Sequence, residues 1–204
     1  MLEQLIPFLT ASIFLTLSPG PDIVFVLVQG ISKGKKAGII TTLGLASGII
    51  VHTSLVAFGV SAVIKQSEVL FLFIKVFGAF YLFYLAFRVF ESDEGISLTS
   101  KSVGTGRKRA LFKQGLIMNV LNPKVTIFFL AFFPGFLWDP TGSTIFQFYV
   151  LGLLFMLQTI LIFGLVALLA GKISQFLKNH PLAGKILKWM QIIVFIGIGV
   201  FILI

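Results

Sequence analysis

The sequence contains no cysteine and very little charge. Of its 204 residues 7 are acidic, 16 are basic and 2 are histidines, so that charged side chains make up only 11%. The absence of cysteine excludes disulfides, thiol nucleophiles and cysteine-ligated metals. The two histidines, His52 and His180, do not form a metal site by themselves. We therefore expect no catalytic residues, no metal and no other cofactor.

The shortage of charge also argues against a soluble protein. Soluble domains are roughly 45–50% apolar and about 25% charged, whereas this chain is 57% hydrophobic with a mean hydropathy of +1.06. Too little polar surface remains to coat a water-soluble fold of this size. The net charge of +9 does not indicate a nucleic-acid partner, because the basic residues occupy short gaps between apolar blocks and not one face.

Apolar residues form six blocks of roughly twenty, the length that a helix needs to cross a bilayer. Glycine, proline and charged residues occupy the gaps between these blocks, as expected between helices. We therefore predict an all-α membrane protein with six transmembrane helices. The N-terminal segment carries Glu3 and no basic region, so we interpret it as a retained first helix and not as a signal peptide. The blocks cover residues 5–28, 39–64, 69–90, 114–136, 145–170 and 186–204.

The distribution of lysine and arginine predicts the orientation of the chain. The first, third and fifth gaps, with the adjoining helix ends, contain 3, 6 and 4 basic residues, whereas the second and fourth contain 1 and 0. The odd-numbered loops are therefore predicted to be cytoplasmic, and both termini to lie outside. The prolines of the first block leave open whether it spans the membrane or is re-entrant.

The longest polar segment, 91–112, lies near the middle of the chain and is predicted to be a cytoplasmic loop. It divides a single transmembrane transporter domain, 1–204, into the halves 1–90 and 113–204. Each half has three helices, so the halves must have opposite orientations. This predicts two inverted three-helix halves.

A faint internal similarity supports such a repeat. The segment Leu17-Ser18-Pro19 aligns with Leu121-Asn122-Pro123 at an offset of 104 residues. In each copy the proline lies inside the first helix of its half, so the first and fourth helices are predicted to be broken. Broken helices at corresponding places in inverted halves indicate a transporter binding site.

The motif Ser-Pro-Gly-Pro-Asp at 18–22 is the first candidate site, and we select Pro19, Gly20, Pro21 and Asp22 as binding residues. Each proline lacks an amide donor and clashes with the preceding helical turn. Carbonyls freed in this way need partners from protein or from water in a cavity. The half-helix that begins near Pro21 directs the partial positive charge of its first amides into the gap. The alternative is a packing kink without a binding role.

Asp22 is the only acid deep within an apolar block. A charge at such a position costs at least about 2.5–3.5 kcal/mol, so these residues usually face a cavity and serve a function. We expect Asp22 to hold a substrate ammonium group, to carry a coupling proton, or to do both in turn. The alternatives are a structural ion pair and a helix cap.

The second candidate site consists of Asn119, Asn122, Pro123 and Lys124 in the fourth block. The two asparagines are three residues apart and share a helix face. Lys124 lies too deep for its amine to reach the membrane surface. It is placed to receive a substrate carboxylate or to pair with Asp22, and a purely structural ion pair is the alternative.

Other polar and small residues within the blocks have expected roles in packing. For His52 and Gln158 we predict interhelical hydrogen bonds. The pair Gly44 and Gly48 forms a GxxxG pattern that lets helices approach closely, either within the bundle or at a dimer interface.

The two motifs together resemble the lysine exporter / threonine–homoserine exporter family of bacterial amino-acid efflux proteins. The segments 78–82 and Phe133–Phe136 agree with that resemblance, which covers essentially the whole chain. It implies a secondary transporter in the lipid bilayer of the bacterial inner membrane, exporting an amino acid or derivative by proton antiport. The resemblance is compatible with a homo-oligomer.

Two other functions are weighed against amino-acid export. A metal or inorganic-ion exporter of a related six-helix group would need cation ligands, which are scarce here. A non-transporting membrane scaffold subunit would not explain two broken helices with charges inside them.

Overall fold

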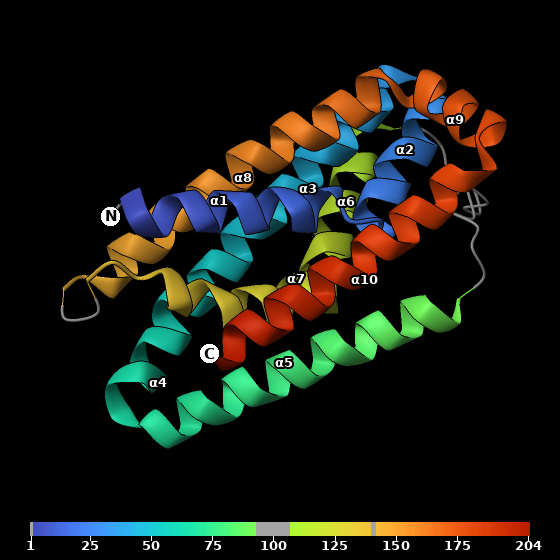
Figure 1. Ribbon diagram of the computed structural model, residues 1–204. Helices are drawn as coiled ribbons and strands as arrows, with labels where there is room; N and C mark the ends of the chain where they lie inside the picture. Colours follow the sequence, from blue (N-terminus) through green and yellow to red (C-terminus); the bar gives the residue numbers. More distant parts are fainter. Residues whose placement is uncertain (1, 93–106, 140–141) are drawn as a thin grey trace.

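The computed structural model describes residues 2–92, 107–139 and 142–204 (Figure 1). These residues form helices, and none of them lies in a β-strand. The predicted loop 91–112 falls largely outside the described residues. The elements in chain order are α1 (Leu2–Leu17), α2 (Pro21–Lys33), α3 (Lys35–Leu55), the π-helical η1 (Val56–Val60), α4 (Ser61–Gln66), α5 (Glu68–Glu91), α6 (Lys108–Val120), α7 (Pro123–Ile127), the π-helical η2 (Phe128–Phe132), the 3-10 helical η3 (Phe133–Phe136), α8 (Thr144–Leu168), α9 (Ala170–Asn179) and α10 (Pro181–Leu203).

Four helices in the described ranges are long and apolar enough to cross a membrane without a break. One of them continues from α3 through η1 into α4 and covers Lys35–Val63, and the others are α5, α8 and α10. α3 packs against α8 and α6, while α10 packs against α5. Counting each of two bent helix pairs as one span raises the number of spans to as many as six.

The two bent pairs are the predicted broken helices. α1 and α2 meet at 54°, and α6 meets the segment Pro123–Phe136 at 49°. Pro21 and Pro123 occupy the first turns of α2 and α7, where a missing amide hydrogen is tolerated and the fixed φ favours a helix start. The prediction that the prolines interrupt these two helices is confirmed.

The structure differs from the sequence prediction at two connections. The loop expected around residues 33–36 is reduced to the single residue Gly34, whose φ of 85° is readily adopted only by glycine. In the fifth gap, Ala170–Asn179 forms the separate helix α9. α9 was not predicted because it is too short and too polar to register as an apolar block.

Both termini lie at the same end of the bundle, and α9 lies at the opposite end (Figure 1). The end with α9 also holds the α2–α3 connection and the first turns of α10, since α9 contacts both α2 and α10. The basic residues of the first and fifth gaps therefore gather at one end of the molecule.

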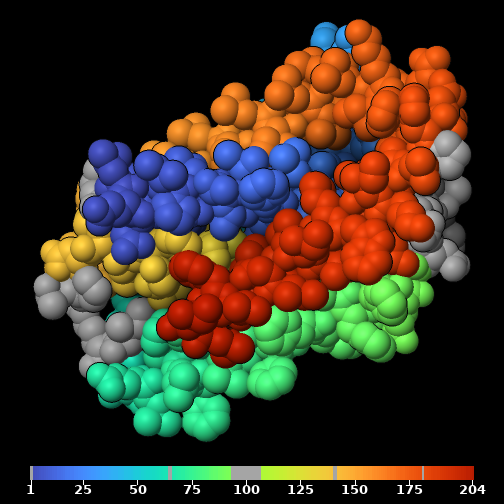
Figure 2. Space-filling model, in the orientation of Figure 1, coloured from blue at the N-terminus to red at the C-terminus, as the bar shows by residue number. Residues whose placement is uncertain are grey.

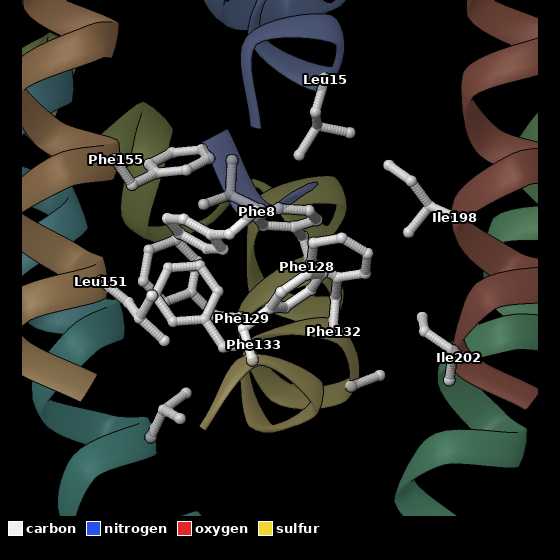
Figure 3. Close-up of a cluster of buried hydrophobic side chains, with 14 of the residues drawn as sticks. Phe8, Leu15, Phe128, Phe129, Phe132, Phe133, Leu151, Phe155, Ile198 and Ile202 are labelled. Carbon is white, nitrogen blue, oxygen red and sulfur yellow. The ribbon is translucent and has the colours of Figure 1, made fainter. Parts of the chain in front are cut away.

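The largest fully buried side chains of the hydrophobic core are phenylalanines, and those of α1, η2 and η3 lie toward the terminal end. Phe8 of α1 meets Phe133 edge to face, with ring centroids 5.1 Å apart, and Phe129 stacks on Phe133 at 3.9 Å. Figure 3 shows these rings packed between α8 and α10. A second, smaller cluster toward α9 consists of Val26, Leu45, Phe163 and Ala167. More buried apolar side chains therefore close the terminal end of the bundle than the end with α9.

Close contact between α3 and α6 depends on glycine. A Cβ atom at Gly44 would collide with the backbone of Phe112, and one at Gly115 would meet the carbonyl oxygen of Thr41. Gly44 and Gly48 therefore serve packing within the bundle, the first of the two roles that the sequence left open.

Replacing Gly44 by alanine tests this contact. The new methyl group has to push two backbones apart, and overpacking of this kind costs about 1–3 kcal/mol. We expect the Gly44→Ala variant to aggregate at a lower temperature than the parent protein in detergent. Gly59→Ala is the control, because a Cβ there meets no atom within 4 Å. Equal thermal stability of the two variants would contradict the close contact.

Candidate functional site

Hydrogen bonds of Asp22 link the two helix breaks. This residue lies in the first turn of α2 and is buried. Its Oδ2 accepts a hydrogen bond from Nδ2 of Asn119 at 2.9 Å, and its Oδ1 accepts one from Nδ2 of Asn122 at 2.9 Å. The side-chain bonds of Asp22 thus reach across to α6 and the second break. This arrangement does not match the cap for α2 that was considered as an alternative role.

Asn122 joins the carboxylate to the start of α7. Its Oδ1 accepts a hydrogen bond from the backbone amide of Lys124 at 3.0 Å, which makes it the N-cap of that helix. Asparagine is among the preferred residues at this position, and Pro123 after it suits the first helical turn. The same side-chain amide therefore caps α7 and binds Asp22.

Lys124 lies at the second break and supplies hydrogen-bond donors to the first break. Its Nζ donates hydrogen bonds to the carbonyl oxygens of Leu15 and Ser18 at 3.0 and 3.1 Å. In a continuous helix Leu15 would bond to the amide of the residue four positions later, which is Pro19 and has no amide hydrogen. Within the described residues Lys124 forms no ion pair with Asp22, so that alternative is not realised. The ring of Phe195 lies 5.3 Å from Nζ, within range of a cation–π contact.

Two glycines lie beside these side chains, and Gly48 makes room for one of them. A Cβ atom at Gly20 would lie 3.4 Å from Nζ of Lys124, and one at Gly48 would lie 2.5 Å from Oδ1 of Asn119. The first distance is an ordinary van der Waals contact, so the approach of Lys124 does not require glycine at position 20. Gly48 lets Asn119 fit between α3 and α6 in the position that reaches Asp22.

His52 and Gln158 surround the site and were not among its predicted residues. Nε2 of His52 lies 3.1 Å from the backbone oxygen of Asn119, which accepts, so this nitrogen carries the proton. Nε2 of Gln158 donates to Oγ1 of Thr16 at 2.9 Å and to Oγ1 of Thr159 at 3.1 Å. The predicted interhelical hydrogen bonds of both residues are confirmed. Their isolation as polar groups in apolar helices was the available signal, but it did not reveal what they face.

A cavity of about 30 Å³ connects the two breaks. A cavity of this size has room for about two water molecules. One part of its wall is polar and includes Asp22 and Lys124, which are the only charged residues that the described part of the chain contributes to it. The other part is apolar and consists of Leu15, Ile23, Ile49, Val125, Phe155 and Phe163.

Several polar atoms near the cavity have no hydrogen-bond partner in the described part of the chain. They include Oδ1 of Asn119, Oγ of Ser18, Oε1 of Gln158 and Nδ1 of His52, all buried. Most buried polar atoms in proteins are paired with protein or water. These atoms therefore mark positions suited to water or to a polar ligand.

The two charged residues also retain bonding capacity. A lysine ammonium has three donors, of which Lys124 uses two in the bonds described above. An ionised carboxylate has about four acceptor positions, and Asp22 uses two. The site is therefore able to bind one cationic and one anionic group together.

Sequence comparison identifies the family. The chain matches the family described as LysE type translocator over residues 13–204. It belongs to this family. The predicted resemblance is confirmed, and the protein is a multi-pass membrane transporter and not an enzyme.

The chain is also similar to curated proteins named leucine efflux protein. Those of Salmonella typhimurium, Salmonella typhi and Salmonella paratyphi A are each 33% identical to it over 147 residues, which is 71% of this chain and 68% of theirs. No solved structure matches the chain.

The bonds made by Lys124 predict a stability effect at the first break. Lys124→Met keeps much of the side-chain volume but leaves two carbonyls without their donor, at a cost of about 1–3 kcal/mol for each unsatisfied group. We expect a lower aggregation temperature in detergent than for Lys113→Met, which alters an exposed residue of α6. A Lys124→Met variant as stable as this control would show that other groups satisfy the carbonyls.

Proposed function

We propose that this LysE-family protein exports a neutral, apolar amino acid or a close derivative across the bacterial inner membrane. The observation that carries the proposal is the cavity between the two breaks, in which one carboxylate and one ammonium group share the wall with apolar side chains. An amino acid offers the complementary set of one ammonium, one carboxylate and one side chain. The binding residues in this proposal are Pro19, Gly20, Pro21, Asp22, Asn119, Asn122, Pro123 and Lys124.

The charged residues set the orientation of the substrate. Asp22 receives the α-ammonium group, and the unpartnered Oδ1 of Asn119 offers it a second acceptor. Lys124 receives the α-carboxylate with its remaining donor. The amides at the start of α7 add partial positive charge on the same side.

The apolar wall favours a neutral side chain. Among the described residues, the lining contains no second acid that would hold a basic side chain once Asp22 is engaged. The name of the leucine efflux proteins agrees with an aliphatic substrate. Burial of such a side chain contributes about 1.5–3 kcal/mol, enough to select it over a charged one of similar length.

Binding requires the site to widen. A cavity of about 30 Å³ is too small for an amino acid, so the conformation described here does not accommodate one. Widening has to separate the two breaks, because residues from both line the cavity. We propose that this movement opens the site to one side of the membrane at a time.

Proton exchange at Asp22 couples this movement to export. An arriving ammonium group favours the ionised carboxylate, and a proton neutralises the carboxylate after the substrate has left. A substrate from the cytoplasm and a proton from outside therefore compete for the same group. Such competition produces antiport and moves the substrate outward.

The arrangement of the helices supports two inverted halves. Each half contains a bent pair followed by two long helices, α3 and α5 in the first and α8 and α10 in the second. Three crossings per half require opposite orientations, and the matching prolines, Pro19 and Pro123, lie at the two breaks.

A metal or inorganic-ion exporter fits this site less well. The ammonium group of Lys124 lines the same cavity as the single carboxylate and would repel a cation. Hard divalent cations bind sites built from several oxygen ligands, and Asp22 is the only acid in this lining within the ranges that the structure describes.

Transport by reconstituted vesicles tests the proposed function. Vesicles loaded with equal amounts of leucine and lysine should release leucine when a proton gradient is imposed and retain lysine. Asp22→Asn keeps the shape of the side chain but removes its charge, so we expect it to abolish proton-driven release. Asn119 has an unpartnered oxygen and is able to rotate its amide toward the new donor, which preserves folding.

Each outcome of this experiment is informative. Lysine release equal to leucine release would contradict the substrate class and leave export intact. Near-normal proton-driven release by Asp22→Asn would make Asp22 a structural residue. Lys113→Met is the control for reconstitution, because its exposed position lies outside the cavity lining.

We further propose that the end with α9 is cytoplasmic and that both termini lie outside, on the basis of the basic residues gathered at that end. The chain lacks cysteine, so single cysteines report their own accessibility. A membrane-impermeant thiol reagent added to intact cells should label a cysteine at Ser143 and not one at Lys172. The opposite pattern would reverse the proposed orientation.

A further inference from the structure

A groove on the outside of the bundle, between α1 and α10, is separate from the Asp22 cavity. Its volume is about 720 Å³, within the range of about 300–1,000 Å³ typical of sites that bury small molecules. α1 and α10 lie on the same face of the molecule (Figure 2). Within the described residues, the lining of the groove is apolar apart from one lysine, and an outer face of this kind is accessible to lipid in a membrane.

The groove runs along one face of α10. Lys185, Trp189, Ile193 and Gly197 line it and follow one another at intervals of four residues, which places them on one stripe. The distance from Lys185 to Gly197 along the helix is about 18 Å. One leaflet of the hydrocarbon core is about 15 Å thick, so the groove matches the length of one acyl chain layer.

Charge is confined to one end of the groove. Lys185 is exposed and lines the groove near the start of α10. Lys172 and Lys178 of α9 lie at the same end of the bundle. The far end contains Gly197, where a Cβ atom would meet no atom within 4 Å, so the groove there is open space. A ligand that fits is negative at one end and apolar along its length.

We propose that this groove binds an anionic phospholipid, with the headgroup at Lys185 and one acyl chain along Trp189, Ile193 and Gly197. The anionic headgroup is favoured because each lysine near a membrane surface attracts acidic lipids. The concave apolar wall surrounds the chain on more sides than a flat helix surface does. The site does not depend on the transport function proposed above.

Fluorescence of Trp189 reports occupancy directly. The chain has two tryptophans, so Trp138→Phe leaves Trp189 as the single reporter. The full chain is reconstituted in phosphatidylcholine bilayers that contain a minor fraction of a lipid with a brominated acyl chain, which quenches tryptophan on contact. We expect brominated phosphatidylglycerol to bind roughly five-fold more tightly than brominated phosphatidylcholine, the factor provided by one lysine.

Two variants in this background separate the parts of the site. Gly197→Leu fills the far end of the groove and should greatly reduce the preferential quenching. Its control is Gly164→Leu on α8, where a Cβ also meets no atom within 4 Å. Lys185→Gln should remove the preference for the anionic lipid but retain quenching by both lipids. Lys172→Gln is the control, because it removes the same charge from α9 outside the groove lining.

Three results would overturn the proposal. Equal quenching by the two brominated lipids in the parent chain would remove the role of the headgroup. An unchanged preference in Gly197→Leu would place the lipid elsewhere. Protection of Trp189 from both lipids, with dimers found by crosslinking, would assign the groove to a second copy of the chain. Elution of every variant as a single species confirms that folding is retained.

Discussion

The hydrogen bonds between the two helix breaks are the constraint on which the rest of the structure depends. Pro19 leaves the carbonyl of Leu15 without its helical donor, and the bilayer offers no replacement. The donor comes from Lys124, beyond the other break. Conversely, Asp22, which follows the first break, accepts a hydrogen bond from Asn122. Asn122 is the N-cap of α7, the helix that follows the second break. Each break is therefore tolerated only in the presence of the other, and neither half of the chain is able to form the site alone.

The apolar packing on the two sides of the Asp22 site differs in size. Toward the termini, the rings of η2 and η3 interlock with Phe8 and with the far end of α10. Toward α9, four residues form the smaller cluster. Separating the stacked rings exposes much more apolar surface than separating the smaller cluster. Local packing thus gives the two routes to the site different energies in the absence of substrate.

The sequence predicted the parts of the site whose signal is local. Proline removes a hydrogen bond wherever it occurs, and an isolated acid or amide stands out in an apolar helix, so Pro19, Asp22 and Asn122 were all identified. The partners of Lys124 were not, because they are backbone carbonyls with no side-chain signature. His52 and Gln158 were recognised as polar but not placed, since helices that are apolar on every side do not reveal which face turns inward. For the same reason the apolar wall of the cavity could not be predicted, because its aliphatic and aromatic residues resemble those on every other face of the helices.

The single-residue connection at Gly34 has a mechanical consequence. α2 carries Asp22 at one end and is joined directly to α3 at the other, so the connection has no slack to absorb a displacement. The distance from Gly34 to Asp22 is about 18 Å along the helix. A rotation of only about 10° at the glycine therefore moves the carboxylate by about 3 Å. This displacement equals the length of its two hydrogen bonds, which are each 2.9 Å. A slight rotation of α2 about Gly34 is therefore sufficient, by geometry, to break the contacts of Asp22 in the interior.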